Sequence, residues 1–104
     1  MKKIFRQGDV MIVEVLAIPK AATKEQREGD IILAHGEVTG HAHRIAAKTA
    51  QARMWSAGAE RFLQAMEMVS LKHEEHSALS IPPGNYQVVI QQEYTPGALR
   101  NVAD

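Results

Sequence analysis

The 104-residue chain contains no cysteine. Disulfide bonds, thiolate nucleophiles and thiolate metal ligands are therefore excluded, and histidine, carboxylate and amide groups are the ligand types that remain. No charge of one sign dominates either, since 12 Lys and Arg residues balance 12 Asp and Glu residues. The chain has no net positive field that would indicate a nucleic acid or an anionic membrane as its partner.

Long hydrophobic runs are also missing. The most apolar stretch, residues 10–18, is interrupted by Glu14 and is far shorter than a membrane span. The N-terminus becomes polar before the apolar region of a signal peptide could form. We therefore expect a soluble, cytoplasmic protein with no membrane segment. A hydrophobic content of 45% is typical of a globular domain, and the length fits a single domain, residues 1–104.

Short segments rich in β-branched and apolar residues, separated by turn signals, predict an all-β fold. The turn signals include Gly8-Asp9 and Pro82-Pro83-Gly84-Asn85. The expected strands include residues 10–16, 30–35, 41–46, 61–66, 68–73 and 86–94. About seven or eight short strands without βαβ alternation predict a small antiparallel barrel or a jelly-roll-like sandwich.

Two segments are harder to assign from the pattern. The apolar residues of 52–76 also fall at helical spacing, so a short helix there is an alternative to strands, which we favour. Residues 20–29 are polar without an apolar period and are expected to form a solvated loop. The large apolar side chains of this region are expected to pack in the core: Met54, Trp55, Phe62, Met66 and Met68.

Four of the five histidines lie in two short stretches, Gly40-His41-Ala42-His43 and His73-Glu74-Glu75-His76. On a strand, the period of two places His41 and His43 on the same face, where they could chelate a metal. His73 and His76 are three residues apart, so they would diverge on a straight strand but could face one site on a helical turn or a bent strand. The alternative is that the first pair is hydrogen-bonded to neighbours and the second stretch is a solvated turn.

Neutral imidazole is a common ligand of transition metals, and this pattern predicts a metal site built from His41, His43, His73 and His76. Nitrogen ligation with carboxylate support suits Zn, Mn, Fe, Ni or Cu and does not separate them. Three protein ligands would leave a position for a small-molecule substrate, as in a hydrolase or oxidative enzyme, with Glu74 or Glu75 as proton acceptor. Four ligands would indicate a structural site, so the pattern leaves open whether the protein is an enzyme.

Two other functions fit the same residues. The histidines could act without metal as acid and base in a phosphodiesterase or ribonuclease, with Arg44 or Lys48 neutralising phosphate charge. The chain could also be a non-enzymatic binding or assembly module. Edge strands and methionine-rich apolar surface favour a homodimer.

The segments GEVTGHAHRI, HEEH, IPPGNY and QQEY resemble a group of short, uncharacterised bacterial and phage-type proteins, which implies no function. The chain is also similar to cupins, small jelly-roll metalloproteins, because His41 and His43 match their first histidine pair and Pro82-Pro83-Gly84 matches a turn. It departs from the cupin pattern at Ala47-Lys48, where a glutamate is expected, and at Tyr86-Gln87, where a histidine is expected. That resemblance implies a β-barrel metal site, whose remaining ligands would have to come from His73 and His76.

Overall fold

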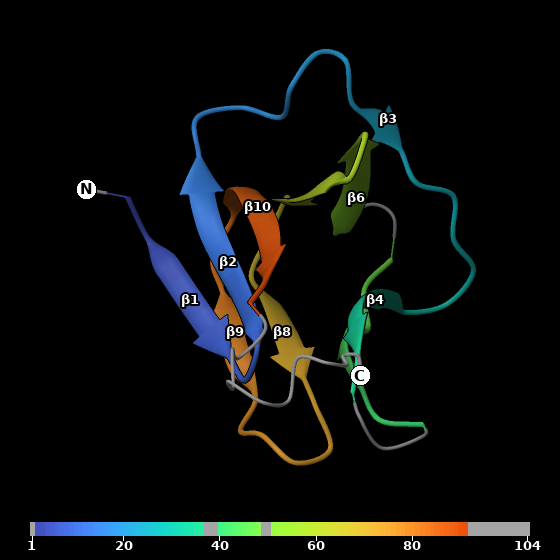
Figure 1. The fold of residues 1–104 in the computed structure, drawn as a ribbon, viewed down its shortest axis with the longest axis vertical. Coiled ribbons are helices and arrows are strands. Elements are labelled where there is room, and N and C mark those ends of the chain that lie inside the picture. The colour runs from blue at the N-terminus through green and yellow to red at the C-terminus, as the bar shows by residue number, and fades with distance from the viewer. Residues whose placement is uncertain (1, 37–39, 49–50, 92–104) are drawn as a thin grey trace, which may run out of the picture.

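The protein is described by a computed structural model that covers residues 2–36, 40–48 and 51–91. Within these ranges the chain forms ten strands and no helix. The strands make two antiparallel sheets that face each other as a sandwich rather than closing into a barrel (Figure 1). The predicted all-β fold is therefore confirmed, in its sandwich form.

The larger sheet has six strands in the order β1-β2-β10-β7-β6-β3. Its strands are β1 (Ile4–Gln7), β2 (Val10–Val15), β3 (Thr23–Lys24), β6 (Ala52–Ala57), β7 (Glu60–Ala65) and β10 (Gly84–Ile90). The smaller sheet has the order β4-β5-β8-β9. Its strands are β4 (Ile31–His35), β5 (Ala42–Ile45), β8 (Val69–Lys72) and β9 (Leu79–Ile81).

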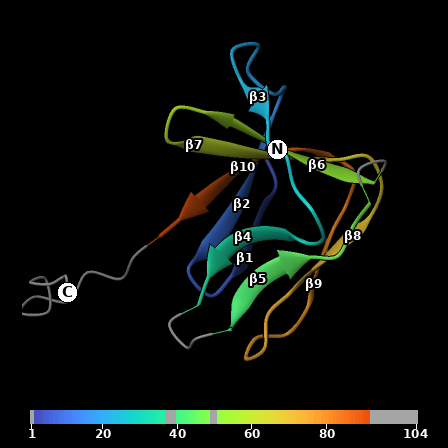
Figure 2. The ribbon, with the colours of Figure 1, turned by 90° about the vertical axis from the view of Figure 1, so that its right-hand side faces the viewer.

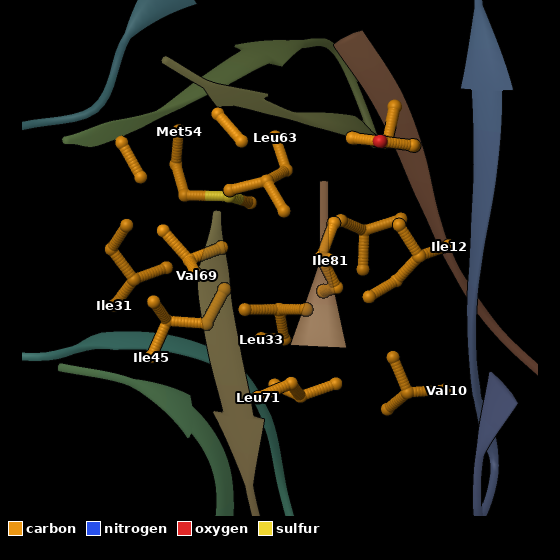
Figure 3. Packing of buried hydrophobic residues seen from close by; sticks show 14 residues of the cluster. Val10, Ile12, Ile31, Leu33, Ile45, Met54, Leu63, Val69, Leu71 and Ile81 are labelled. Carbon is orange, nitrogen blue, oxygen red and sulfur yellow. The ribbon is translucent and has the colours of Figure 1, made fainter. Parts of the chain in front are cut away.

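The core lies between the two sheets, where alternate side chains of facing strands interdigitate (Figure 3). In β2, β4 and β8 the inward positions are occupied by β-branched or leucine side chains, in agreement with a period of two. Burying each of these side chains contributes about 1.5–3 kcal/mol. The central members are Val10, Ile12, Ile31, Leu33, Ile45, Met54, Leu63, Leu71, Ile81 and Tyr86.

The predicted turn at Pro82-Pro83 joins β9 of the smaller sheet to β10 of the larger one. The hydroxyl of Tyr86, which is fully buried, donates a hydrogen bond of 2.6 Å to the carbonyl of Pro82. Burial raises the pKa of Tyr86, so this hydroxyl stays protonated and keeps donating. The hydrogen bond ties the crossing between the sheets to the core.

Several sequence-based expectations differ from the structure. Residues 52–76 contain β6, β7, β8 and the start of the β8–β9 loop, so the helical alternative is wrong for the described residues. The short strands β1, β3 and β9 were not expected, because each gains its stability from neighbouring strands rather than from a long apolar pattern. Met54 and Phe62 are buried as expected, but Met66 and Met68 are exposed, because they occupy the β7–β8 connection. The end of the strand expected over 86–94 lies outside the described residues beyond position 91.

A β-bulge in β4 shapes the edge of the smaller sheet. The register with β5 shifts between Ile32 and Ala34, so Leu33 is the extra residue. Arg61 on β7 of the opposite sheet donates to the carbonyls of Leu33 (3.0 Å) and Ile32 (3.1 Å). The same guanidinium pairs with both carboxylate oxygens of Glu25 at 2.9 Å. One arginine therefore holds the bulged strand against the other sheet.

Three connections meet at one end of the sandwich, the lower end in Figure 1. They are the β1–β2 turn, the β8–β9 loop and the ends of β4 and β5 where these strands join (Figure 2). The histidine-containing stretches lie in two of these three connections, so the fold brings them to the same end.

No segment of the described residues forms a helix capable of crossing a membrane.

We predict that Glu25→Gln destabilises the protein at neutral pH by about 1–2 kcal/mol, because a partly buried, charge-assisted pair is lost. The Arg61 guanidinium lowers the pKa of the Glu25 carboxyl below its usual range. A lowered folded-state pKa means that the stabilisation is complete above the usual carboxyl pKa of about 4.3 and is lost as pH falls through the folded value. Urea unfolding at neutral and acidic pH measures this change.

The matched control is Glu60→Gln, since Glu60 is exposed and its side chain accepts one hydrogen bond among the described contacts, of 3.2 Å from Gln87. It should change the free energy of unfolding by no more than about 0.5 kcal/mol. A difference between wild type and Glu25→Gln that stayed constant from neutral to acidic pH would contradict the proposed role of the ion pair.

Candidate functional site

All five histidines of the chain line one cavity of about 250 Å³. The cavity lies at the end of the sandwich where the β1–β2 turn, the β4–β5 strand ends and the β8–β9 loop meet. Its described lining residues are Asp9, Val10, Ala34, His35, Gly36, His41, His43, His73, Glu75, His76 and Ile90. The two histidine-containing stretches that the sequence singled out are thus brought together by the fold.

Four imidazole rings are neighbours in this cavity. The ring of His73 lies between the others, with its centre 4.3 Å from that of His43, 4.7 Å from that of His76 and 5.9 Å from that of His41. The centres of His43 and His76 are 5.7 Å apart. His73 and His76 can both face the cavity because residues 74–76 form a bend rather than a straight strand. His35 also lines the cavity but is exposed.

His43 is the most enclosed of these histidines, with 5% of its surface exposed. Its Nδ1 lies 2.8 Å from Oε1 of Gln7, whose side chain is also buried. Nε2 of Gln7 donates to the carbonyls of Leu71 and Ser77, each at 2.9 Å. Gln7 therefore connects β1 of the larger sheet with β5, β8 and the β8–β9 loop.

The surroundings of His43 keep its imidazole neutral. Burial lowers the pKa of His43 below its usual value, and the neighbouring His73 and His76 lower it further. Asp9 and Glu74 act in the opposite direction but do not outweigh these effects. A neutral imidazole retains a nitrogen lone pair, which is what either a metal ligand or a proton acceptor requires.

Glu75 contacts two of the other histidines. Its Oε2 lies 3.0 Å from Nδ1 of His41, within ion-pair distance. The two groups are not aligned as a hydrogen bond, and Nδ1 of His41 is buried without a hydrogen-bond partner among the described residues. The contact is therefore electrostatic. The backbone N–H of Glu75 donates to Nδ1 of His73 at 3.0 Å.

Glu74 has a different position from Glu75. It is not among the described residues that line the cavity. Its Oε1 accepts a hydrogen bond of 2.9 Å from the backbone N–H of Ala42, and its Oε2 accepts one of 3.2 Å from Arg44. The Ala42 N–H, more than Arg44, lowers the pKa of the Glu74 carboxyl. Glu74 thus joins the β8–β9 loop to the start of β5, next to the histidine pair.

Two glycines allow the histidines to come this close. A Cβ atom at Gly8 would lie 2.8 Å from Nε2 of His76 and 3.3 Å from Cε1 of His43. A Cβ atom at Gly36 would lie 3.0 Å from Nε2 of His73. Gly8 also has a φ of +58°, the left-handed conformation required at the first position of a type II′ hairpin turn. Side chains at these positions would occupy space that the imidazoles use.

The cavity contains no Lys or Arg among its described lining residues, whereas two carboxylates and five imidazoles line it. This set of groups favours a cation over an anion. Within the described ranges, no three His, Asp or Glu side chains are placed to hold one metal ion together. Binding an ion there would therefore require rotation of imidazole side chains within the cavity.

Residues 6–91 match the model of a family described as a domain of unknown function (DUF8820). The chain belongs to this family. The matched span includes Gln7 and all of the described residues that line the cavity, so these residues lie within the part of the chain that the family comprises. Comparisons with curated proteins and with solved structures find no match. Membership of the DUF8820 family agrees with the resemblance to uncharacterised proteins and carries no activity with it.

Sequence reasoning singled out the five-histidine region and Glu75, which line the cavity, and Glu74, which does not, but it missed Gln7, Gly8 in its packing role, and Gly36. A buried glutamine at a strand end looks like any polar residue before a turn, and its three partners come from distant parts of the chain. The one available signal was position, since Gln7 directly precedes the Gly8-Asp9 turn signal. Only the packing of the sheets shows that this turn lies against His76.

We predict that Gly8→Ala is more destabilising than Gly58→Ala, although both glycines begin two-residue hairpin turns at similar φ, +58° and +63°. A left-handed alanine costs about 1–2 kcal/mol at either position. Only at Gly8 would the new methyl group meet a histidine, since nothing lies within 4 Å of a Cβ at Gly58. Crowding should add about 1 kcal/mol, because the exposed ring of His76 can shift whereas the buried ring of His43, 3.3 Å from the new Cβ, has little room to move.

Chemical denaturation compares the two variants, and the NMR signals of the His76 ring give a second readout. These ring signals should move in Gly8→Ala and remain in place in Gly58→Ala. Equal destabilisation by the two substitutions, with unchanged His76 signals, would show that the β1–β2 turn does not pack against the histidines.

Proposed function

We propose that the cavity binds a divalent transition metal through His41, His43 and one or both of His73 and His76. The observation that carries this proposal is the composition of the cavity wall, with five imidazoles, two carboxylates and no Lys or Arg among the described residues. Imidazole and carboxylate are the ligand types that Zn, Mn, Fe, Ni and Cu accept in the absence of thiolates.

The spacing of the rings supports this function. Imidazoles that bind one Zn²⁺ tetrahedrally, through nitrogens at about 2.0–2.1 Å, have ring centres about 5 Å apart. The four ring contacts in the cavity span 4.3–5.9 Å, on both sides of this value. The rings are therefore already at the separation that ligands of one ion require, and rotation of the side chains is the change that binding would add.

The contacts of Nδ1 in two of the histidines also support metal binding. Metal-binding histidines commonly have an acceptor behind the ring nitrogen that does not bind the metal, which fixes the ring. The Oε1 of Gln7 occupies this position behind His43, and Oε2 of Glu75 lies near Nδ1 of His41. For His43 this leaves Nε2 as the nitrogen available to an ion.

The phosphodiesterase alternative has less support. Arg44, which the sequence offers as a phosphate-neutralising group, donates to the carbonyl of Gly40 and to Glu74. Neither Arg44 nor Lys48 is among the described residues of the cavity wall. An anionic substrate would therefore meet carboxylates rather than cations.

A bound divalent ion would supply Lewis acidity to an oxygen-containing small molecule. The cavity volume of about 250 Å³ leaves room for such a molecule beside the ion. Val10, Ala34 and Ile90 form the apolar part of the wall, and exposed Glu75 is the carboxylate placed to accept a proton from a molecule held there.

We predict that protein purified without a histidine tag binds one Zn²⁺ or Co²⁺ per chain, with a rise in melting temperature that EDTA reverses. The double variant His41→Ala/His43→Ala should lose this binding, because it removes two of the ligands that the proposal requires. His35→Ala should bind normally, since His35 is exposed at the rim. Calorimetric titration and elemental analysis measure the stoichiometry, and full metal retention by the double variant would end the proposal.

The two neighbouring glutamates provide a matched pair. We predict that Glu75→Gln weakens metal affinity by about 10–100-fold, as is usual when the outer partner of a ligand histidine is altered. Glu74→Gln should change affinity far less, because Glu74 faces the Ala42 N–H and Arg44 rather than the cavity. Comparing both variants by competition with a metal-binding dye tests this, and equal losses of affinity would contradict the assignment of Glu75 to the site.

A further inference from the structure

We propose that Gln7 is a positioning residue that holds His43 in the Nδ1–H tautomer, while the backbone of the β8–β9 loop holds His73 in the opposite, Nε2–H tautomer. The two adjacent rings would then present the cavity with one nitrogen lone pair and one N–H donor. On the proposed metal function, this arrangement makes His43 a ligand through Nε2 and leaves His76, rather than His73, to complete the ligand set.

The first step of the argument is the orientation of the Gln7 amide. Its nitrogen has two hydrogens, and two backbone carbonyls, of Leu71 and Ser77, lie 2.9 Å from that nitrogen. If the amide were turned over, its oxygen Oε1 would face both carbonyl oxygens. Three hydrogen-bond acceptors would then meet with no hydrogen between them. Because the side chain is only 4% exposed, water cannot relieve this conflict. The oxygen of Gln7 must therefore face His43.

The second step is the proton on His43. Oε1 of Gln7 can only accept, so the hydrogen in the 2.8 Å contact must belong to Nδ1 of His43. A neutral imidazole carries one hydrogen, which leaves Nε2 of His43 as a lone pair. The wall of the cavity contains this ring, and the rings of His73 and His76 lie alongside it.

The third step concerns His73, whose contacts have the opposite polarity. A backbone N–H can only donate, so the 3.0 Å contact from Glu75 requires a lone pair on Nδ1 of His73. In the neutral ring the hydrogen is then on Nε2, the atom that lies against Gly36 in the cavity wall. An Nε2–H group cannot bind a metal but can donate to an acceptor atom of a bound molecule.

Two-bond ¹H–¹⁵N correlation spectra test this in metal-free protein, at about pH 8, where histidines are neutral. They distinguish protonated from unprotonated ring nitrogens, and the variants His43→Ala and His73→Ala identify the signals. We expect the hydrogen on Nδ1 of His43 and on Nε2 of His73. Finding the Nε2–H tautomer in His43, or the same tautomer in both rings, would overturn the proposal. This measurement requires no metal, so its outcome is separate from that of the metal-binding experiment.

Variants of Gln7 test its positioning role. Gln7→Met has a similar length but no acceptor, and should give a mixture of tautomers in His43. Gln87→Met is the control, because Gln87 on β10 donates only to exposed Glu60 among the described contacts, and its histidine signals should match wild type. An unchanged His43 tautomer in folded Gln7→Met would overturn the role of Gln7. If Gln7→Met does not fold, the wild-type spectra decide, because an Nε2–H tautomer in His43 would leave Oε1 of Gln7 without a donor from that ring.

Zn²⁺ binding by single-histidine variants tests whether His76, rather than His73, is a ligand. His73→Ala should retain one Zn²⁺ per chain, whereas His76→Ala and His43→Ala should each lose at least about tenfold in affinity. Loss of binding in His73→Ala, with normal binding in His76→Ala, would contradict the assignment of His76 as a ligand and of His73 as an N–H donor. If no variant and no wild-type protein binds metal, the proposed function fails while the tautomer assignment is still decided by the spectra.

Discussion

The buried amide of Gln7 is the interaction on which the candidate site depends. It lies at the end of β1 in the larger sheet and reaches β5, β8 and the β8–β9 loop of the smaller one. A buried amide is costly unless its polar atoms are paired, and here the oxygen and both hydrogens have partners. Because those partners come from three separate segments, the amide is satisfied only when the two sheets and the loop have their native positions.

The same end of the sandwich shows how a small domain can hold polar groups close together. The core between the sheets is apolar, and the imidazoles lie beyond its end, where the connections meet. Glycines at positions 8 and 36 replace side-chain volume with space for His76 and His73. The stability of the domain therefore comes from the core, and the polar end can be arranged for binding without disrupting it.

A second polar network, outside the cavity, fixes the strand end that carries part of the cavity wall. Arg61 reaches from the larger sheet to the carbonyls at the bulge of β4, and Glu25 neutralises it. The bulge precedes Ala34, His35 and Gly36, which line the cavity. A bulge shifts the phase of the side chains that follow it, so holding the bulge in place also determines how the end of β4 faces the histidines.

Much of the fold could be predicted from the chain alone, because β structure depends on a local period of two and on turn residues. The strands expected over residues 10–16, 30–35 and 68–73 correspond to β2, β4 and β8, and the Gly8-Asp9 and Pro82-Pro83 turns are present. Short strands such as β3 and β9 could not be predicted, since they are stabilised by pairing with neighbours rather than by their own pattern.

For the site, the sequence by itself determined which chemistry was available: histidine and carboxylate groups without thiols, in two dense stretches. Only the tertiary structure decided that all five histidines line one cavity and that Glu75 faces it while Glu74 braces β5. The role of Gln7 was also decided there. Residues 7, 43 and 71 are far apart in the chain, and their contacts exist only because the two sheets pack face to face, which no local pattern encodes.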